Sequence, residues 1–224
     1  MQDQDVRVPD ERAEPEHGRD GHRRRNRRGR VLRVLGYTLI LVALALGGYV
    51  WWTLWGTGFE TRAAQGDLRP VFEDSVGTRT VEEAPPAAEV VKVPGRAVAI
   101  LKIPTIDVDY VVVEGTDTES LKKGPGHYSQ TSYPWEEEGA VGIAGHRTTY
   151  GAPFWALDEL SAGDTIVLET EFGIFEYRVT RSKVIAPSDG SVLRDTRRPT
   201  LVLTTCTPRF SAAQRLIVFA DRVD

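Results

Sequence analysis

The chain has few of the residues that form disulfide bonds or bind metal ions. Its 224 residues include one cysteine and four histidines. A single cysteine excludes an intramolecular disulfide framework. A zinc site built from His127, His146 and Cys206 has little support, because the chain contains no C-x-x-C or H-x-x-x-H spacing. We therefore expect no metal and no cofactor, and the thiol of Cys206 is either an inert buried side chain or a reactive group.

Charged residues are missing from residues 34–59, and VLGYTLILVALALGGYVWWTLW (34–55) is apolar almost throughout. About 20 apolar residues in a helix span the hydrocarbon core of a bilayer. The alternative is a signal peptide, whose apolar region has about 7–15 residues and ends in small residues. Here the run ends in Trp51, Trp52 and Trp55, which is typical of an interfacial aromatic belt. The sequence therefore predicts an uncleaved transmembrane helix over 34–55.

Charge is distributed unevenly on the two sides of this helix. Residues 1–33 carry a formal charge of +3 and the remainder carries −7. The arginine run HRRRNRRGRVLR (22–33) lies directly before the span, where basic residues mark the cytoplasmic side. We interpret 1–33 as a disordered cytoplasmic tail and place the rest of the chain outside the cell membrane. Nucleic-acid binding by the arginine run is the alternative, and the acidic remainder does not favour it.

The part after the span divides into a linker and a folded domain. Residues 56–95 contain Pro70, Pro85 and Pro86 with little periodicity, which predicts an extracellular stalk. From residue 96 to 224, short β-branched or alternating runs recur between turn signals. The expected strands are 97–104, 108–115, 140–146, 164–170, 174–180, 199–206 and 215–223, with short helices at 117–124 and 153–160. Many short strands with brief helices indicate a mainly β domain folded as a closed or nearly closed barrel.

The surroundings of the cysteine bear on its reactivity. Cys206 ends the β-branched run TLVLTTC and precedes a loop with Pro208, and Arg215 opens the next apolar run. If these runs pair as a hairpin across 207–214, Arg215 lies nearly opposite Cys206, with Cβ atoms about 5 Å apart. A guanidinium there favours the thiolate and could hold an oxyanion. An edge-strand charge pointing to solvent is the alternative for Arg215.

A nucleophilic thiol commonly works with a histidine. His17 and His22 lie on the cytoplasmic side of the predicted span, so His127 and His146 are the candidates. His146 ends the run AVGIAGH, and His127 lies in the glycine- and proline-containing loop GPGHY. Either could instead be a hydrogen-bonded structural histidine.

The segments AGHRTTYGAPF (144–154) and VLTTCTPRFSAAQRL (202–216) resemble the sortases, cysteine transpeptidases of Gram-positive cell surfaces. The resemblance covers about residues 95–223, with Val202 where the family pattern TLxTC has threonine, and GPGHY is most similar to the class E branch of actinobacteria. It implies an eight-stranded barrel behind one transmembrane helix, with Cys206 as nucleophile, His146 as general acid/base and Arg215 as oxyanion or substrate stabiliser. It also implies that Thr205, His127 and Tyr128 contact the substrate.

The same resemblance implies cleavage of an LPxTG-like sorting signal between Thr and Gly through a thioacyl intermediate. Class E enzymes prefer LAxTG, and an amine of a peptidoglycan precursor (lipid II-like) receives the acyl group. Three alternatives remain. A pilin-polymerising sortase usually adds a C-terminal membrane segment and a lid. A cysteine L,D-transpeptidase has a histidine and a glycine close before the cysteine, where this chain has LTT. A non-catalytic cell-wall binding module would be indifferent to loss of Cys206.

Overall fold

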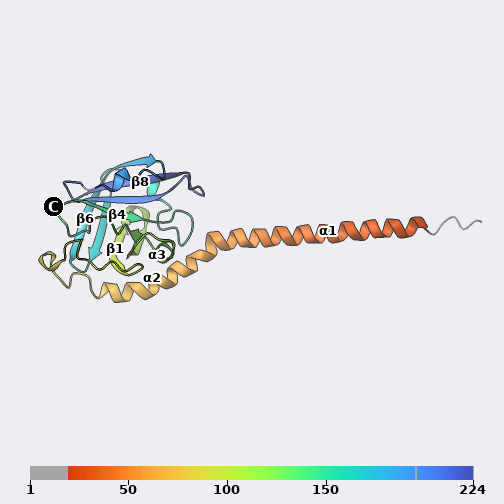
Figure 1. Ribbon diagram of the computed structural model, residues 1–224, viewed down its shortest axis with the longest axis horizontal. Coiled ribbons are helices and arrows are strands. Elements are labelled where there is room, and N and C mark those ends of the chain that lie inside the picture. The colour runs from red at the N-terminus through yellow and green to blue at the C-terminus, as the bar shows by residue number, and fades with distance from the viewer. Residues whose placement is uncertain (1–19, 195, 224) are drawn as a thin grey trace, which may run out of the picture. The chain divides into compact units, whose positions relative to one another are not determined.

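The computed structural model describes residues 20–194 and 196–223, and the contacts divide the chain into Met1–Tyr49 and Val50–Asp224. The described part of the first unit belongs to helix α1 (Asp20–Trp51), whose last two residues fall in the second unit. Within this helix, Gly29–Trp51 is long and apolar enough to cross a membrane. The helix therefore covers most of the predicted span and ends at Trp51, where a π-helical turn (Trp52–Gly56) follows. The predicted tail lies outside the described residues over 1–19, and over 20–33 it is helical (Figure 1).

The second unit contains a closed eight-stranded β-barrel, which confirms the expected fold. Its strand order is β1-β2-β3-β4-β7-β8-β6-β5, with parallel pairing of β2 with β3 and of β4 with β7. The strands are β1 (Ala97–Ile103), β2 (Val108–Glu114), β3 (Gly126–His127), β4 (Ala140–Ala144), β5 (Thr165–Thr170), β6 (Gly173–Ile185), β7 (Thr200–Thr207) and β8 (Gln214–Arg222).

The helices outside α1 are short, apart from α2 (Thr57–Glu73). Helix α3 (Thr118–Lys123) begins after Asp117, whose carboxylate accepts hydrogen bonds from the backbone N–H groups of Glu119 and Ser120. This is the N-cap that satisfies the first free donors of a helix. The remaining elements are 3-10 turns at Val81–Glu83, Pro104–Ile106, Leu157–Glu159 and Gly190–Leu193.

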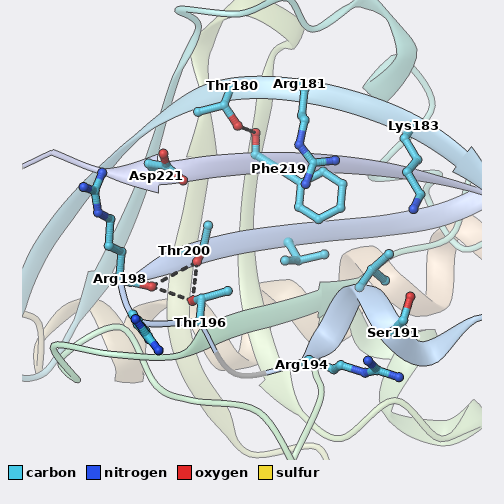
Figure 2. A pocket seen from close by; sticks show the side chains of 13 residues that line it. Thr180, Arg181, Lys183, Ser191, Arg194, Thr196, Arg198, Thr200, Phe219 and Asp221 are labelled. Carbon is cyan, nitrogen blue, oxygen red and sulfur yellow. Dashed lines mark hydrogen bonds between the residues drawn. The ribbon is translucent and has the colours of Figure 1, made fainter.

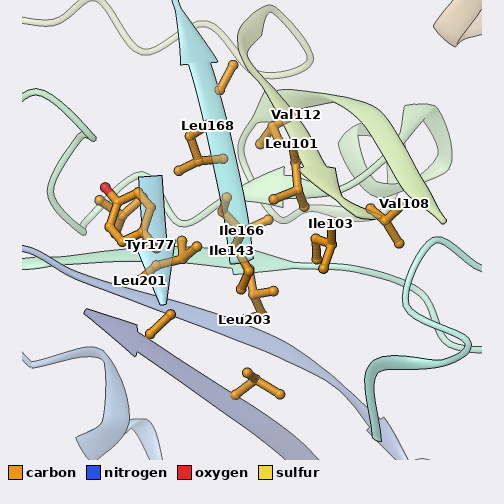
Figure 3. Close-up of a cluster of buried hydrophobic side chains, with 14 of the residues drawn as sticks. Leu101, Ile103, Val108, Val112, Ile143, Ile166, Leu168, Tyr177, Leu201 and Leu203 are labelled. Carbon is orange, nitrogen blue, oxygen red and sulfur yellow. The ribbon is translucent and has the colours of Figure 1, made fainter. Parts of the chain in front are cut away.

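Period-two alternation explains why these segments close into a barrel. Phe175, Tyr177 and Val179 of β6 point inward, and the odd-numbered Leu201 and Leu203 of β7 do the same. Figure 3 shows Tyr177, Leu201 and Leu203 packed with side chains of β1, β2, β4 and β5 in one interior cluster. The other face of β7 and β8 carries a smaller apolar cluster of Val202, Ile217 and Phe219 with Ala140 and Ile185. The inner face of β7 and β8 therefore packs in the barrel core, and part of their outer face packs against Val192 and Leu193.

The segment expected to be a linker differs most from the sequence interpretation. Residues 57–73 form helix α2, which lies along the edge of β2. Strand β3 pairs only with Val113 and Glu114, so it leaves the rest of that edge without a strand partner. The Gln65 side chain supplies one, because its Oε1 accepts from the Val111 N–H at 2.7 Å and its Nε2 donates to the Val111 carbonyl at 2.9 Å. Arg69 continues the row by donating to the Asp109 carbonyl at 2.9 Å.

Two smaller expectations also need correction. The segment 153–160, expected to form a short helix, contains only a 3-10 turn. Phe154 and Leu157 in this segment are buried, and Trp155 is 42% exposed. Strand β6 runs on to Ile185, five residues past the predicted end. Its exposed continuation pairs with β8 and lacks the alternation that identifies a strand in the sequence.

Candidate active site

The ends of three neighbouring strands bring Cys206, His146 and Arg215 to one rim of the barrel. Strands β4, β7 and β8 are adjacent in the sheet. Cys206 pairs directly with Arg215 across β7 and β8, as the hairpin interpretation predicts. The parallel pairing of β4 with β7 matches Ala144 with Thr204, so His146, two residues on, follows β4 toward the level of Cys206.

Cys206 faces the outside of the barrel. Leu201 and Leu203 point into the core, so Val202, Thr204 and Cys206 occupy the opposite face of β7. The Cys206 side chain is partly exposed. A thiol on a fixed strand at the barrel surface is accessible to an extended peptide, and an inert buried cysteine is excluded.

Arg215 lies on the same face as Cys206, because directly paired antiparallel residues project to one side. Its Nη1 donates to the carbonyl oxygens of Ala212 and Gln214, both at 3.1 Å. Among the described residues it makes no ion pair. The guanidinium is anchored by the loop through one nitrogen and retains charge and donors for a ligand.

One ring nitrogen of His146 has no hydrogen-bond partner among the described residues. Its Nε2 is buried and has no hydrogen-bond partner among the described residues, and its Nδ1 lies 3.5 Å from the Thr149 hydroxyl. The ring also lies against Tyr150, with centroids 4.9 Å apart. Burial lowers the pKa of His146 below its ordinary value of 6.5. Burial therefore favours the neutral imidazole, which can accept a proton.

Two of the residues expected at the substrate have other positions. Thr205 is buried, and its hydroxyl donates to the Gly145 carbonyl at 2.7 Å. It joins β7 to the residue before His146 and is not open to a substrate.

His127 is also buried, and both of its ring nitrogens are engaged. Nδ1 lies 3.0 Å from the Glu114 carboxylate, and Nε2 lies 3.0 Å from the Ser132 carbonyl. Burial alone would raise the pKa of Glu114, but hydrogen bonds from His127, Ser129 and Tyr133 bring that pKa below its ordinary value. The structure supports the alternative of a structural histidine.

Tyr128 does lie beside the strand that carries the cysteine. It is partly exposed, and its hydroxyl is 2.9 Å from the hydroxyl of Thr204, which shares the outer face of β7 with Cys206. Gly142 of β4 lies close to the same ring, where an added Cβ would approach it to 2.9 Å. Tyr128, Thr204 and Gly142 thus shape the surface leading to the thiol.

Arg147 is a site residue that the sequence reasoning missed. Its side chain is 3% exposed and pairs with Asp158 at 2.7 Å. It also donates to the Thr207 hydroxyl at 3.2 Å and to the Cys206 carbonyl at 3.5 Å. Arg147 therefore joins the residue after His146 to the end of β7. Its adjacency to His146 was the only signal in the sequence, since buried arginines are not distinguishable from exposed ones by pattern.

A closed β-barrel with a surface thiol and an arginine on adjacent strands, and a histidine two residues after the next strand, is the arrangement of a cysteine enzyme. Comparison with known proteins specifies it further. The family model of the sortase domain matches residues 101–223. Sortase D of Bacillus subtilis is 32% identical over 200 residues, covering 85% of this chain and 98% of that protein.

Two solved structures agree with this match. Sortase E1 from Streptomyces coelicolor, solved with a tripeptide in its active site, is 36% identical with a TM-score of 0.55, covering 60% of this chain and 92% of that chain. A Clostridium perfringens sortase D5 transpeptidase is 28% identical with a TM-score of 0.60, covering 74% of this chain and 99% of that chain. The protein belongs to the sortase family and is a cysteine transpeptidase.

Proposed function

We propose that this protein is a membrane-anchored sortase of the class E type that transfers surface proteins to the cell wall. It cleaves an LAxTG- or LPxTG-like sorting signal between Thr and Gly and passes the acyl group to an amine of a peptidoglycan precursor. The observation that carries the proposal is the pairing of Cys206 with Arg215 on the outer face of the sheet, next to the strand that leads to His146. Helix α1 supplies the anchor, with the basic N-terminal side in the cytoplasm and the barrel outside.

The first half of the reaction forms the acyl enzyme. The proton of the Cys206 thiol moves to Nε2 of His146, and the sulfur attacks the threonine carbonyl carbon. The Arg215 guanidinium stabilises the negative charge that develops on the carbonyl oxygen. When the C–N bond breaks, His146 returns the proton to the departing glycine amine, which leaves a thioester on Cys206.

The second half reverses these roles. The acceptor amine attacks the thioester carbonyl, His146 takes its proton, and the C–S bond breaks as a new amide forms. The proton then returns to the sulfur and restores the starting state. Water in place of the amine would give hydrolysis, so exclusion of water from the thioester decides the outcome.

Transfer by the full-length chain in detergent micelles tests the proposal. LAxTG and LPxTG peptides are supplied with and without an amine acceptor, and the transfer product is quantified by mass spectrometry. We expect product from the wild type and a loss of at least about 100-fold in Arg215→Lys, since one oxyanion donor contributes about 10²–10³ in rate. Arg209→Lys is the matched control, because Arg209 lies in the loop between β7 and β8, before the strand that carries Arg215, and bonds to Trp155 and Asp158. Equal rates in both variants would contradict the role of Arg215.

A further inference from the structure

A positively charged cleft lies on the same outer face as Cys206, farther along the strands. It has a volume of about 730 Å³, and five basic side chains and one acidic side chain line it. The basic ones are Arg181, Lys183, Arg194, Arg197 and Arg198. Residues 34–224 carry a formal charge of −7, so the net charge of the cleft is opposite in sign to that of the part of the chain that contains it.

The two walls of the cleft come from separate segments. Arg181 and Lys183 project from β6, and Arg194 lies on the opposite side, after the 3-10 turn (Figure 2). Val202 and Phe219 are the apolar part of the lining. The Arg181 guanidinium stacks on the Phe219 ring at 3.8 Å, which fixes one charge over the cleft.

Most of the positive charge in the cleft is not paired with a carboxylate of the described residues. None of the five basic side chains makes an ion pair within 4.0 Å in the described part of the chain. Asp221 lines the cleft, with Arg198 extending toward it in Figure 2. Asp189 is held by Ser191, and its pKa is lowered by that hydrogen bond and in part by Lys183 and Arg194. Asp195 lies outside the described residues. Clustered basic groups that have no ion-pair partner among the described residues attract an anionic ligand.

Register connects the cleft to the thiol. Along β7, β8 and β6, the row of Cys206 is Cys206–Arg215–Ile185, and the row four residues farther is Val202–Phe219–Arg181. Four residues of extended chain cover about 13 Å. Tyr128 and Leu193 cover the outer face between the two rows, at Thr204 and Gly142, so a peptide that runs over them from Cys206 toward Val202 enters the cleft after about four residues.

The direction of the peptide follows from the proposed function, on which this inference rests. Four of the five residues of an LAxTG-like signal precede the scissile bond, so they require the longer track, and β7 ends one residue past Cys206 at Thr207. The residues that reach the cleft are those immediately before the signal in the substrate protein. We propose that the cleft lined by Arg181, Lys183, Arg194 and Phe219 is a specificity subsite that recognises acidic side chains directly upstream of the sorting signal.

Binding to the full-length Cys206→Ala chain tests the subsite independently of cleavage. Three fluorescent peptides share one LAxTG segment and differ in the three preceding residues, which are glutamates, glutamines or lysines. We expect the glutamate peptide to bind about five- to tenfold more tightly than the glutamine peptide and the lysine peptide more weakly still, since each exposed ion pair contributes modestly. The preference should shrink as salt rises from 0.1 to 1 M, where the screening length falls from about 10 to about 3 Å.

Charge reversal locates the effect. Lys183→Glu and Arg194→Glu should each lower the glutamate-to-lysine affinity ratio about fivefold. Arg178→Glu on the same strand, whose partner is Glu176 outside the cleft, should leave it unchanged. Equal affinities for the three peptides overturn the inference, and so does displacement of all three alike by poly(glycerol phosphate), which would assign the cleft to an anionic polymer. Wild-type kcat/KM with the glutamine peptide separately reports on the proposed function, so that either can fail alone.

Discussion

At the residue scale, the position of His146 depends on a glycine beside it. A Cβ added at Gly145 would lie 2.5 Å from the ring of Phe154, which is fully buried. Because that ring cannot move without opening the core, Gly145→Ala should lower stability by about 1–3 kcal/mol and displace the end of β4. We therefore expect transpeptidation to fall with it. Gly190→Ala is the control, since nothing lies within 4 Å of its added Cβ.

Thermal unfolding and transfer rate are measured for both glycine variants. A Gly145→Ala chain that unfolds and reacts like the wild type would show that the space around His146 is not determined by this contact.

The protonation of His146 gives the folded state a pH dependence. Burial lowers its folded pKa, so below pH 6.5 the unfolded chain binds more protons than the folded one. The stability that depends on a neutral His146 is fully present above pH 6.5 and is lost as the pH falls through the pKa of His146 in the folded state. We expect the Tm of the wild type to drop more between pH 7.5 and 5.5 than that of His146→Gln. Parallel Tm curves for the two chains would contradict a neutral buried imidazole.

Two buried tyrosines provide a matched pair for the value of a hydroxyl hydrogen bond. The Tyr177 hydroxyl is buried without a partner among the described residues, whereas the Tyr133 hydroxyl donates to Glu114 at 3.0 Å. Tyr177→Phe should stabilise the protein by about 1 kcal/mol, because an unpaired buried polar group is costly. Tyr133→Phe should destabilise it by about 1.5–3 kcal/mol, since its acceptor is a carboxylate. Denaturant unfolding at constant m-value measures both, and destabilisation by Tyr177→Phe would indicate a partner that the geometry does not show.

At the element scale, helix α2 covers the open edge of β2 through the amide of Gln65. Gln65→Leu would leave the Val111 N–H and carbonyl and the Lys123 carbonyl without this partner. We expect a loss of about 2–3 kcal/mol. Gly66→Ala, next to it on the exposed side, has free space for its methyl group and should stabilise the helix by about 0.5–1 kcal/mol. Equal and small effects of the two substitutions would mean that α2 is only a spacer.

The elements that the sequence predicted are those with a periodic apolar pattern. The runs 97–104, 108–115 and 199–206 became β1, β2 and β7 because β-branched residues mark buried strands. Helix α2 was missed because it binds the edge of β2 through polar side chains such as Gln65. It also contains Pro70, and a proline within a polar segment is typical of a linker. Strand β3 has two residues and no period to detect.

The same distinction holds for the candidate site. The hairpin argument placed Arg215 opposite Cys206 because strand register follows from loop length. The assignment of Thr205 and His127 to the substrate came from the family resemblance, which does not say what these side chains bond to. Period-two alternation from Leu201 and Leu203 places Thr205 on the inner face of β7. The partners of Thr205 and His127, Gly145 and Glu114, are distant in sequence.

At the scale of the whole molecule, the basic cleft and the rim that carries Cys206 lie on one face of the barrel. The rim on β4, β7 and β8 holds the thiol, the imidazole and the guanidinium, and the basic cleft begins about 13 Å along the same strands. The opposite face of those strands forms the core. The thiol and the basic cleft are therefore carried by one surface of the same sheet.

Intact-mass measurement of the full-length chain in detergent micelles tests the central claim most directly. The chain is mixed with an LAxTG peptide without an acceptor amine, and the reaction is stopped with acid. We predict a mass increase equal to the peptide acyl fragment ending in threonine, located on Cys206 by fragmentation, absent in Cys206→Ala and discharged by an added amine. Binding of the peptide with no covalent adduct on folded wild-type protein would contradict thioacyl transfer at Cys206.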